Sequence, residues 1–342
     1  MPRIPTQKNP RWLRPRHRNP IIKMIEEEYI PINPDTRKPE TDPDKDWRLE
    51  AFQVRLLNRA FLEVWQPSKR IKIPEWNTFI WSQPKKSGKT AMAGAVGYAW
   101  ARHYGGEILF VANDKEQARD RAFNRVTMMF NWLRANRKSQ YDSMVESQTN
   151  DALELKDPYA LLRAIPCDPG GEAGGFQSLT IWDELWNYKG DNANALWSEL
   201  QPIPNIPVSA RFVVTYAGHY GKADLLYSIY EQAVQPDPEN DDQPQGQRVA
   251  GLEDLPCFDY GNMFCYWDHD ARMPWHTEEF LEQARNDPVM KTQPHEYERL
   301  WRNRWTTGLN AFIDMNKVDK LMRQGDAMGL YNRMDAFLGE EL

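Results

Sequence analysis

Two hydrophobic periods alternate along this chain and predict helices and strands in turn. In the segment 47–65, apolar side chains recur at helical spacing, as Leu49, Phe52 and Leu56 illustrate, so an amphipathic helix is expected there. β-rich runs follow, separated by helix-forming or turn-forming segments. The expected strands cover residues 77–82, 107–112, 152–155, 161–165, 179–182 and 211–216, and the expected helices cover residues 90–104, 114–136 and 223–233.

Alternation of strands and helices is typical of a mostly parallel sheet with helices on both faces. We therefore expect an α/β core at residues 47–235. The segment 236–246 is acidic and contains prolines, which predicts an exposed loop. Residues 236–314 carry aromatic residues, prolines and short helix signals, so a smaller appended α/β subdomain is expected there, followed by a helical tail at residues 315–342.

The first 46 residues differ in composition from the rest of the chain. Residues 1–23 hold seven basic side chains and no acidic one, and residues 26–45 are rich in proline and charge. Such a composition buries too little apolar surface to order itself alone. Residues 1–46 are therefore expected to be an extended basic, proline-rich arm and linker. The arm is either solvated, or an extension that wraps the molecule, touches DNA or touches a neighbouring subunit.

Candidate phosphate-binding chemistry lies in the segment "TFIWSQPKKSGKTAMAGAV", where a β-rich run leads into a helix. Phosphates bind to backbone N–H groups at a helix N-terminus, while a lysine neutralises their charge and a hydroxyl ligates Mg²⁺. Ser87, Gly88, Lys89 and Thr90 supply these groups. Gln83 replaces the first glycine of the G-x-x-x-x-G-K-[ST] pattern, but the later N–H groups hold the phosphate. The alternative is an ordinary turn in which Ser87 caps the helix.

A pair of carboxylates follows the apolar run in "SLTIWDE". Asp183 is expected to hold Mg²⁺ through water, and Glu184 is expected to activate the attacking water. Acidic pairs at strand ends also occur as solvated caps or as helix starts. Because both this pair and the segment around Lys89 follow a predicted strand, at a separation of a few βα units, their conjunction favours hydrolysis of ATP with Mg²⁺.

Bulk composition narrows the class of protein further. The chain has 342 residues, of which 41% are apolar, so it can bury a full α/β sheet. It contains no apolar run of about 18 residues, so no membrane association is expected. Three cysteines without a C-x-x-C pair indicate neither a disulfide framework nor a zinc ribbon. A net charge of −6 counts against tight nucleic-acid binding by the chain as a whole.

Several ordered motifs together resemble the ATPase part of the large terminase subunit of tailed bacteriophages, the motor that pumps DNA into the capsid. The resemblance runs from Leu49 to about Ile313 and includes "LEAFQVRLL", "FVANDKEQARDRAFNRV", "IWDELW", "VVTYAGHYGKADLLYSIY", "WDHDARMPW" and "RLWRNRWTTGLNAFI". It implies the P-loop NTPase fold and an adenine-reading role for Gln53. It also implies a coupling role for Thr215 at the end of a strand near the γ-phosphate. The alternative is that Thr215 is a strand residue at the edge of the core.

The resemblance further implies a cationic finger at the transferring phosphoryl group. Lys85 occupies the matching place in the loop, but a lysine lacks the planar fork of arginine. A finger from a neighbouring subunit is the alternative, supplied by Arg163, Arg211 or an arginine of the segment 115–136.

The family also carries a nuclease domain, and the residues after Ile313 are too few to form one. We therefore expect ATP-driven DNA handling without DNA cleavage by this sequence. The implied partners are double-stranded DNA, the portal protein, the small terminase subunit and further copies of the chain in a ring. The implied location is the cytoplasm of the bacterial host, transiently on the procapsid portal. Two other hypotheses remain open, a helicase-like DNA-dependent ATPase and a catalytically silent packaging-assembly protein.

Overall fold

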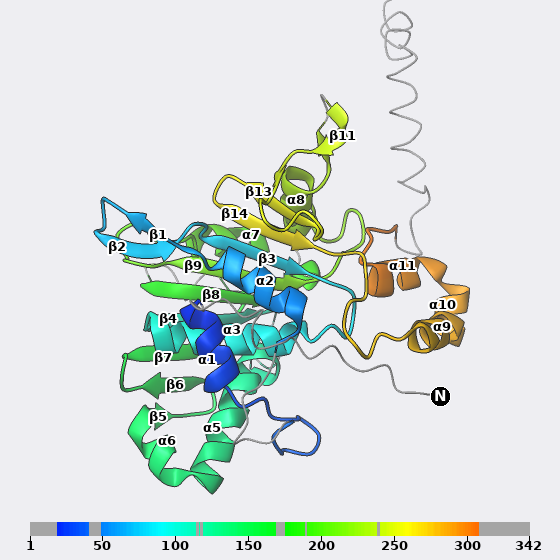
Figure 1. Cartoon of the computed structure of the whole chain (residues 1–342). Coiled ribbons are helices and arrows are strands. Elements are labelled where there is room, and N and C mark those ends of the chain that lie inside the picture. Colours follow the sequence, from blue (N-terminus) through cyan, green and yellow to red (C-terminus); the bar gives the residue numbers. More distant parts are fainter. Residues whose placement is uncertain are drawn as a thin grey trace, which may run out of the picture.

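A ten-stranded sheet organises the molecule (Figure 1). The computed structural model describes residues 19–40, 49–113, 116, 119–168, 175–188, 190–237 and 240–307. The strands lie in the order β12-β13-β14-β3-β9-β8-β4-β7-β6-β5. Their bounds are β3 Thr78–Ser82, β4 Gly106–Ala112, β5 Val145–Gln148, β6 Ala152–Leu155, β7 Ala160–Pro166, β8 Gln177–Asp183, β9 Ala210–Thr215, β12 Gln247–Arg248, β13 Cys257–Tyr260 and β14 Met263–Trp267.

The middle of the sheet is parallel and both edges are antiparallel. Neighbouring strands run parallel from β14 through β3, β9, β8 and β4 to β7, whereas β12 and β13 at one edge and β6 and β5 at the other pair antiparallel. The expected mostly parallel α/β sheet is thus confirmed. Two short hairpins lie outside it, β1 Glu63–Gln66 with β2 Ile71–Pro74, and β10 Pro236–Asp237 with β11 Asn240–Pro244.

Helices cover both faces of the sheet. The described helices are α1 Pro20–Glu27, α2 Ala51–Ala60, α3 Lys89–His103, η2 Arg119–Phe123, α5 Asn124–Asn136, α6 Lys138–Met144, η4 Leu185–Asn187, α7 Gly190–Glu199, α8 Asp224–Ala233, α9 Glu278–Asn286, α10 Pro288–Thr292 and α11 Pro294–Arg302. Alternate side chains of the strands belong to two hydrophobic cores: Phe79 and Trp81 pack with α1, α2, α3 and α5, and Ile80 packs with α7 and α8. The parallel strands are therefore buried on both faces, as their continuous apolar runs require.

The helix expected at 47–65 ends at Ala60, and the chain continues into β1 at Glu63. Four other segments differ from the sequence-based expectation. The segment 236–246, expected as a loop, contains the hairpin β10–β11. Strand β14 pairs with β3, so the expected appended subdomain at 236–314 contributes three strands to the central sheet, and only α9, α10 and α11 form a separate cluster (Figure 1). The expected helix at 114–136 is interrupted at Arg121, whose φ of −101° and ψ of −116° are not helical. The expected tail at 315–342 lies outside the described residues.

The fourth difference concerns the N-terminal arm. Its described part contains α1, which buries Ile21, Ile22 and Ile25 in the core beside α3. This part of the arm is a packed helix because its three isoleucines share one face and find an apolar partner. Residues 1–18 lie outside the description. Within the described chain, no helix combines the length and apolar character needed to cross a membrane.

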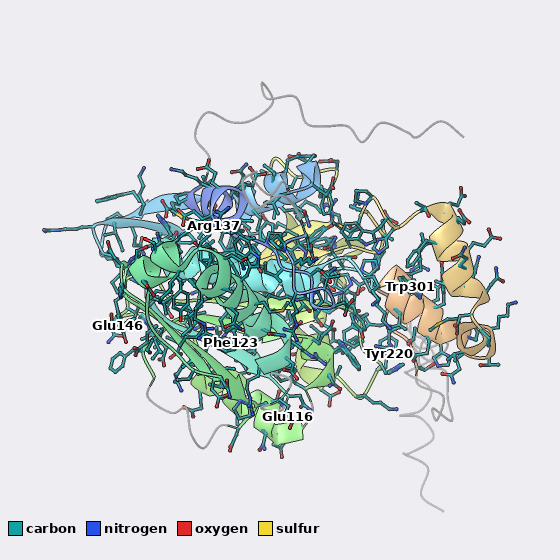
Figure 2. All side chains as sticks on the ribbon, turned by 90° about the horizontal axis from the view of Figure 1, so that it is seen from below. Glu116, Phe123, Arg137, Glu146, Tyr220 and Trp301 are labelled. Atoms are coloured by element: carbon teal, nitrogen blue, oxygen red, sulfur yellow. The ribbon has the colours of Figure 1, made fainter. Side chains whose placement is uncertain are left out.

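The α9–α11 cluster lies at the end of the molecule to which the carboxyl ends of the parallel strands point (Figure 1). In the perpendicular view, its residue Trp301 lies at one end of the molecule and Glu146 of β5 at the other (Figure 2). Trp301 packs edge-on against Phe280 and His276. The cluster thus has a small aromatic core of its own. It lies beside the loop that follows β3.

Candidate nucleotide site

Three neighbouring parallel strands bring the predicted site residues together. Ser82 at the end of β3 is in register with Thr215 at the end of β9, and Asp183 at the end of β8 is in register with Val214 of β9. The loop 83–88 therefore leaves the sheet beside the two other strand ends. Ligands of parallel α/β sheets bind outside the carboxyl ends of the strands, and this edge is the candidate site.

The loop 83–88 wraps around the first turn of α3. Ser87 Oγ donates a hydrogen bond to the Pro84 carbonyl at 2.7 Å, and Lys89 Nζ donates to the same oxygen at 3.1 Å. Lys86 and Gly88 have φ of 67° and 76°, and Gly88 immediately precedes α3. Glycine adopts this left-handed conformation without strain. The Ser87 side chain thus closes the loop, and does not cap the helix.

Gln83 explains how the loop forms without its first glycine. The side chain is fully buried and turned toward the sheet, where Oε1 accepts from Trp81 Nε1 at 2.7 Å and Nε2 donates to the Tyr266 hydroxyl at 3.3 Å. The hydroxyl in turn donates to Asp268 Oδ2 at 2.5 Å. Trp81 lies in β3, Tyr266 lies in β14 and Asp268 follows β14. The glutamine side chain therefore lies in the core beneath the loop.

Asp183 and Thr90 form the candidate Mg²⁺ site. The Thr90 hydroxyl donates to Asp183 Oδ1 at 3.2 Å, and Asp183 Oδ2 is buried without a hydrogen-bond partner in the described part of the chain. Burial, and after it the neighbouring charge of Glu184, raise the pKa of Asp183 to about 7, against the lowering effect of Arg121. Hydroxyl and carboxylate oxygens are ligands that Mg²⁺ prefers, so a divalent cation fits this donor set and would favour the charged carboxylate.

Lys89 presents a buried ammonium group to the same place. Burial lowers its pKa, while the charges of Glu184 and Asp183 act in the opposite direction. Its Nζ also lies 4.9 Å from the ring centroid of Tyr216. An ammonium group held at low dielectric beside two carboxylates interacts strongly with any further anion that enters.

Glu184 is held in an unusual backbone and side-chain position. Its φ is 61°, and its amide N donates to the Val214 carbonyl at 2.8 Å. Oε2 accepts from Trp186 Nε1 at 2.6 Å. The Trp186 backbone N donates to Thr215 Oγ1 at 3.3 Å, and Thr215 is fully buried. Glu184 and Thr215 are therefore connected through one tryptophan.

The contacts of Arg299 extend this connection to α11. Arg299 is buried, with its guanidinium 4.7 Å from the Trp186 ring and 5.3 Å from the Tyr216 ring. Glu296 holds it at 2.8 Å. Nothing in the local pattern distinguishes a buried arginine on α11, or shows that Trp186 and Tyr216 lie beside the carboxylates.

The candidate arginine fingers differ in position. Arg121, at the break between η2 and α5, lies near enough for its charge to lower the pKa of Asp183. Arg211 is buried, and its side chain donates to the carbonyls of Leu200 and Trp197. Arg163 pairs with Glu107 at 2.7 Å. Arg211 thus has no route to a neighbouring subunit, and Arg121 is the arginine whose charge acts on the carboxylates within this chain.

The α9–α11 side of the site contacts the loop directly. Lys85 N donates to the Leu300 carbonyl at 2.6 Å, and Trp275 Nε1 donates to the Lys86 carbonyl at 2.8 Å. The charge of Lys85 lowers the pKa of Lys89, so the Lys85 ammonium is near it. Gln53 is buried, accepts from the Glu50 amide at 3.0 Å, and contacts Met273 Sδ at 3.9 Å. Gln53 therefore caps the N-terminus of α2. It lies beside Met273, close in sequence to Trp275, which hydrogen-bonds the loop.

These features define the class of fold: an α/β P-loop fold with its loop after β3 and its acidic pair after β8. Among solved structures, the chain is similar to the large terminase of bacteriophage HK97, with a TM-score of 0.53 and 16% sequence identity. The alignment covers 83% of this chain and 54% of the terminase chain, about half of its length. No protein-family model matches the sequence, and no curated protein matches it. At this identity the likeness establishes the fold.

Proposed function

We propose that this chain is the ATP-hydrolysing motor of viral DNA packaging, a terminase large-subunit ATPase that moves double-stranded DNA into a procapsid. The observation that carries the proposal is the convergence of Lys89, Thr90, Asp183, Glu184 and Thr215 at three adjacent strand ends. The likeness to the HK97 terminase fold supports the same assignment.

The residues have distinct roles in this proposal. The amides of Ser87 to Thr90 and the Lys89 ammonium bind the β- and γ-phosphates. Thr90 and Asp183 hold Mg²⁺, which neutralises charge on the transferring phosphoryl group when bound. Glu184 orients and deprotonates the attacking water. Lys85 and Arg121 add positive charge at the γ-phosphate, and Gln53 reads the adenine.

Coupling in this proposal passes through Thr215. Its hydroxyl accepts a hydrogen bond from the Trp186 amide and donates one to the Tyr216 carbonyl. Thr215 therefore links the segment that follows the acidic pair to the segment that follows β9. A change at the γ-phosphate thereby reaches Tyr216, Arg299 and α11. The proposed partners are duplex DNA, the portal protein, the small terminase subunit and further copies in a ring. The proposed place of action is the host cytoplasm, on the procapsid portal.

Steady-state hydrolysis of Mg-ATP with and without duplex DNA tests the proposal. Lys89→Ala and Glu184→Gln should each reduce kcat at least about 100-fold, the usual contribution of a positioned base or phosphate-binding charge. Lys72→Ala and Glu199→Gln are matched controls, because both side chains are exposed and lie in other elements. Unwinding of a forked duplex would indicate a helicase instead. Wild-type protein without any ATP turnover would leave the silent assembly protein as the better assignment.

A further inference from the structure

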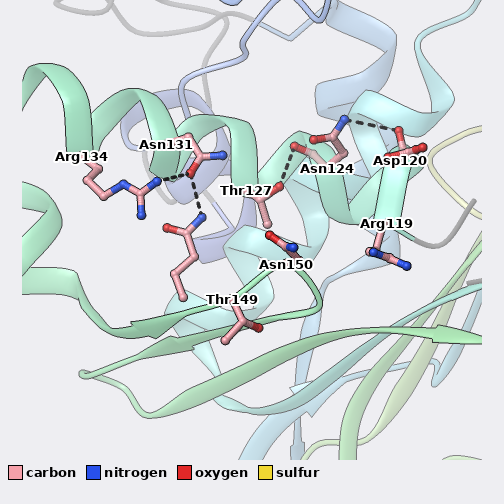
Figure 3. Close-up of a pocket in the computed structure, with 9 residues that line it drawn as sticks. Arg119, Asp120, Asn124, Thr127, Asn131, Arg134, Thr149 and Asn150 are labelled. Carbon is pink, nitrogen blue, oxygen red and sulfur yellow. Dashed lines mark hydrogen bonds between the residues drawn. The ribbon is translucent and has the colours of Figure 1, made fainter. Parts of the chain in front are cut away.

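A polar groove lies between α5 and the turn that joins β5 to β6 (Figure 3). Its accessible volume is about 390 Å³. One wall is a stripe of residues at helical spacing, and the other is the turn between β5 and β6. The lining residues that matter here are Arg119, Asn124, Thr127, Asn131, Arg134 and Gln148.

The groove lies beside a basic stretch of an acidic protein. The chain carries a net charge of −6, yet residues 121–141 include five basic residues and no acidic one. Two arginines flank the groove, and Arg134 makes no ion pair within the described residues. Its carboxylates are few: Asp120 lines it, and Asp151 pairs with Arg119 at 3.1 Å. Among the described residues, Arg134 is thus the cation of the groove without an ion-pair partner, and it attracts an anionic ligand.

The donors of the groove are pre-arranged. Asn131 Oδ1 accepts from Arg134 Nη2 at 3.3 Å and from Gln148 Nε2 at 3.1 Å (Figure 3). The Tyr141 hydroxyl donates to Gln148 Oε1 at 2.9 Å, so the glutamine is fixed from both sides. One acceptor thus holds a guanidinium and an amide beside each other, and further N–H groups on each remain for a ligand.

We propose that this groove binds the phosphate backbone of double-stranded DNA, a statement that rests on the proposed DNA-moving function. Guanidinium, amide and hydroxyl groups are the usual phosphate contacts of DNA-binding proteins, and they bind without reading sequence. From Asn124 to Arg134, α5 rises about 15 Å, which equals roughly four nucleotide steps along one strand. The groove therefore follows a short stretch of backbone.

Composition favours DNA over a protein partner. No aromatic or large apolar side chain is among the residues that line the groove. Stable protein–protein contacts depend on such anchors at their centre, whereas contacts to duplex phosphates do not. A neighbouring subunit as the occupant is accordingly an outcome that the experiment distinguishes.

The groove is also connected to the nucleotide site through one short segment. Arg119 lines the groove, and Arg121, two residues further, acts electrostatically on Asp183. The backbone of η2 departs from helical geometry at Arg121, between the groove and the nucleotide site. DNA in the groove therefore contacts η2, the element that contains Arg121. Because the charge of Arg121 acts on Asp183, DNA binding should alter the rate of ATP hydrolysis.

Fluorescence anisotropy of a labelled 30-base-pair duplex, titrated with the full chain and Mg-ATPγS at several salt concentrations, tests the proposal. Arg134→Glu should weaken binding roughly tenfold and lower the salt slope by about 1. Asn131→Ala should weaken it less and leave the salt slope unchanged. The matched control is Arg285→Glu on α9, which makes the same change of net charge at an exposed position. Basal ATP hydrolysis should stay at the wild-type rate in all three.

The outcomes separate failure of this proposal from failure of the proposed function. Equal DNA affinity of Arg134→Glu and Arg285→Glu overturns the groove, whatever the ATPase rate. A changed oligomeric state of Arg134→Glu in light scattering, at unchanged DNA affinity, assigns the groove to a neighbouring subunit and also overturns it. Absence of basal ATP turnover in the wild type contradicts the proposed function, while a selective loss of DNA affinity still supports the groove.

Discussion

Asn303 ties three strand ends together beneath the candidate site. It ends α11 in the left-handed conformation, with a φ of 48°, and is fully buried. Its Oδ1 accepts from the Ala217 amide at 2.7 Å, and its Nδ2 donates to Ser82 Oγ and to the Asp268 carbonyl, both at 2.9 Å. One side chain thereby joins the segments that follow β3, β9 and β14. We expect Asn303→Ala to be strongly destabilising.

The size of the effect follows from these contacts. The substitution takes the side-chain partner away from two buried main-chain groups, at a cost of about 1–3 kcal/mol each. Alanine in the left-handed conformation costs roughly 1 kcal/mol more. The free energy of unfolding should therefore fall by about 3–7 kcal/mol, a large part of the stability of a domain. Asn303→Gly removes the same hydrogen bonds without the backbone strain, so it should be about 1 kcal/mol less destabilised than Asn303→Ala.

Urea unfolding followed by tryptophan fluorescence measures the change, provided that the dependence on urea stays the same. Asn286→Ala, an exposed asparagine at the end of α9, is the control and should lie within about 0.5 kcal/mol of the wild type. A loss below about 1 kcal/mol in Asn303→Ala would refute the reasoning, because it would mean that water or rearranged backbone satisfies the buried groups.

Three further substitutions test other contacts of the site. Gln83→Gly should lower the free energy of unfolding by about 2–4 kcal/mol in urea titrations, through a cavity and lost buried hydrogen bonds, while ATP affinity measured by calorimetry is kept; loss of ATP binding would contradict the structural role. Trp186→Phe removes the indole N–H that donates to Glu184. Basal ATP hydrolysis should rise roughly tenfold, which corresponds to the free energy of one charge-assisted hydrogen bond; an unchanged rate would count against a restraining role of Trp186. Burial lowers the pKa of His276, so the unfolded chain binds more protons near pH 6.5 and stability is lost as pH falls through that value. His276→Phe should therefore show a smaller drop in Tm between pH 7.5 and 5.5, and an equal drop would refute the assignment.

The parallel strands were predictable from the sequence because each is a short apolar run with a turn behind it. The expected strand at 107–112 lies within β4, and the expected strand at 179–182 lies within β8. Strand β5 was missed, since its sequence "VESQ" is polar and it forms only by pairing with β6 at an edge. The pairing of β14 with β3 joins residues far apart in sequence, which no local pattern reveals.

For the candidate site, the sequence indicated which residues lie near one another where a strand end determines their position. Lys89, Thr90 and Asp183 follow strands, so parallel topology brings them together. Arg121 was not singled out, because the segment 114–136 has a helical pattern and its break is set by tertiary contacts. Trp186 was not singled out either, although its indole donates a hydrogen bond to Glu184.

The hydrogen bond between Lys85 N and the Leu300 carbonyl has a consequence for how the loop can vary. Both atoms belong to the main chain, so the link makes no demand on either side chain. Position 85 is free to exchange lysine for arginine or a neutral residue without loosening α11. Proline is the exception, because it lacks the donor. The chemistry offered to a phosphate at this point can therefore diversify while the mechanical attachment of the C-terminal helices persists.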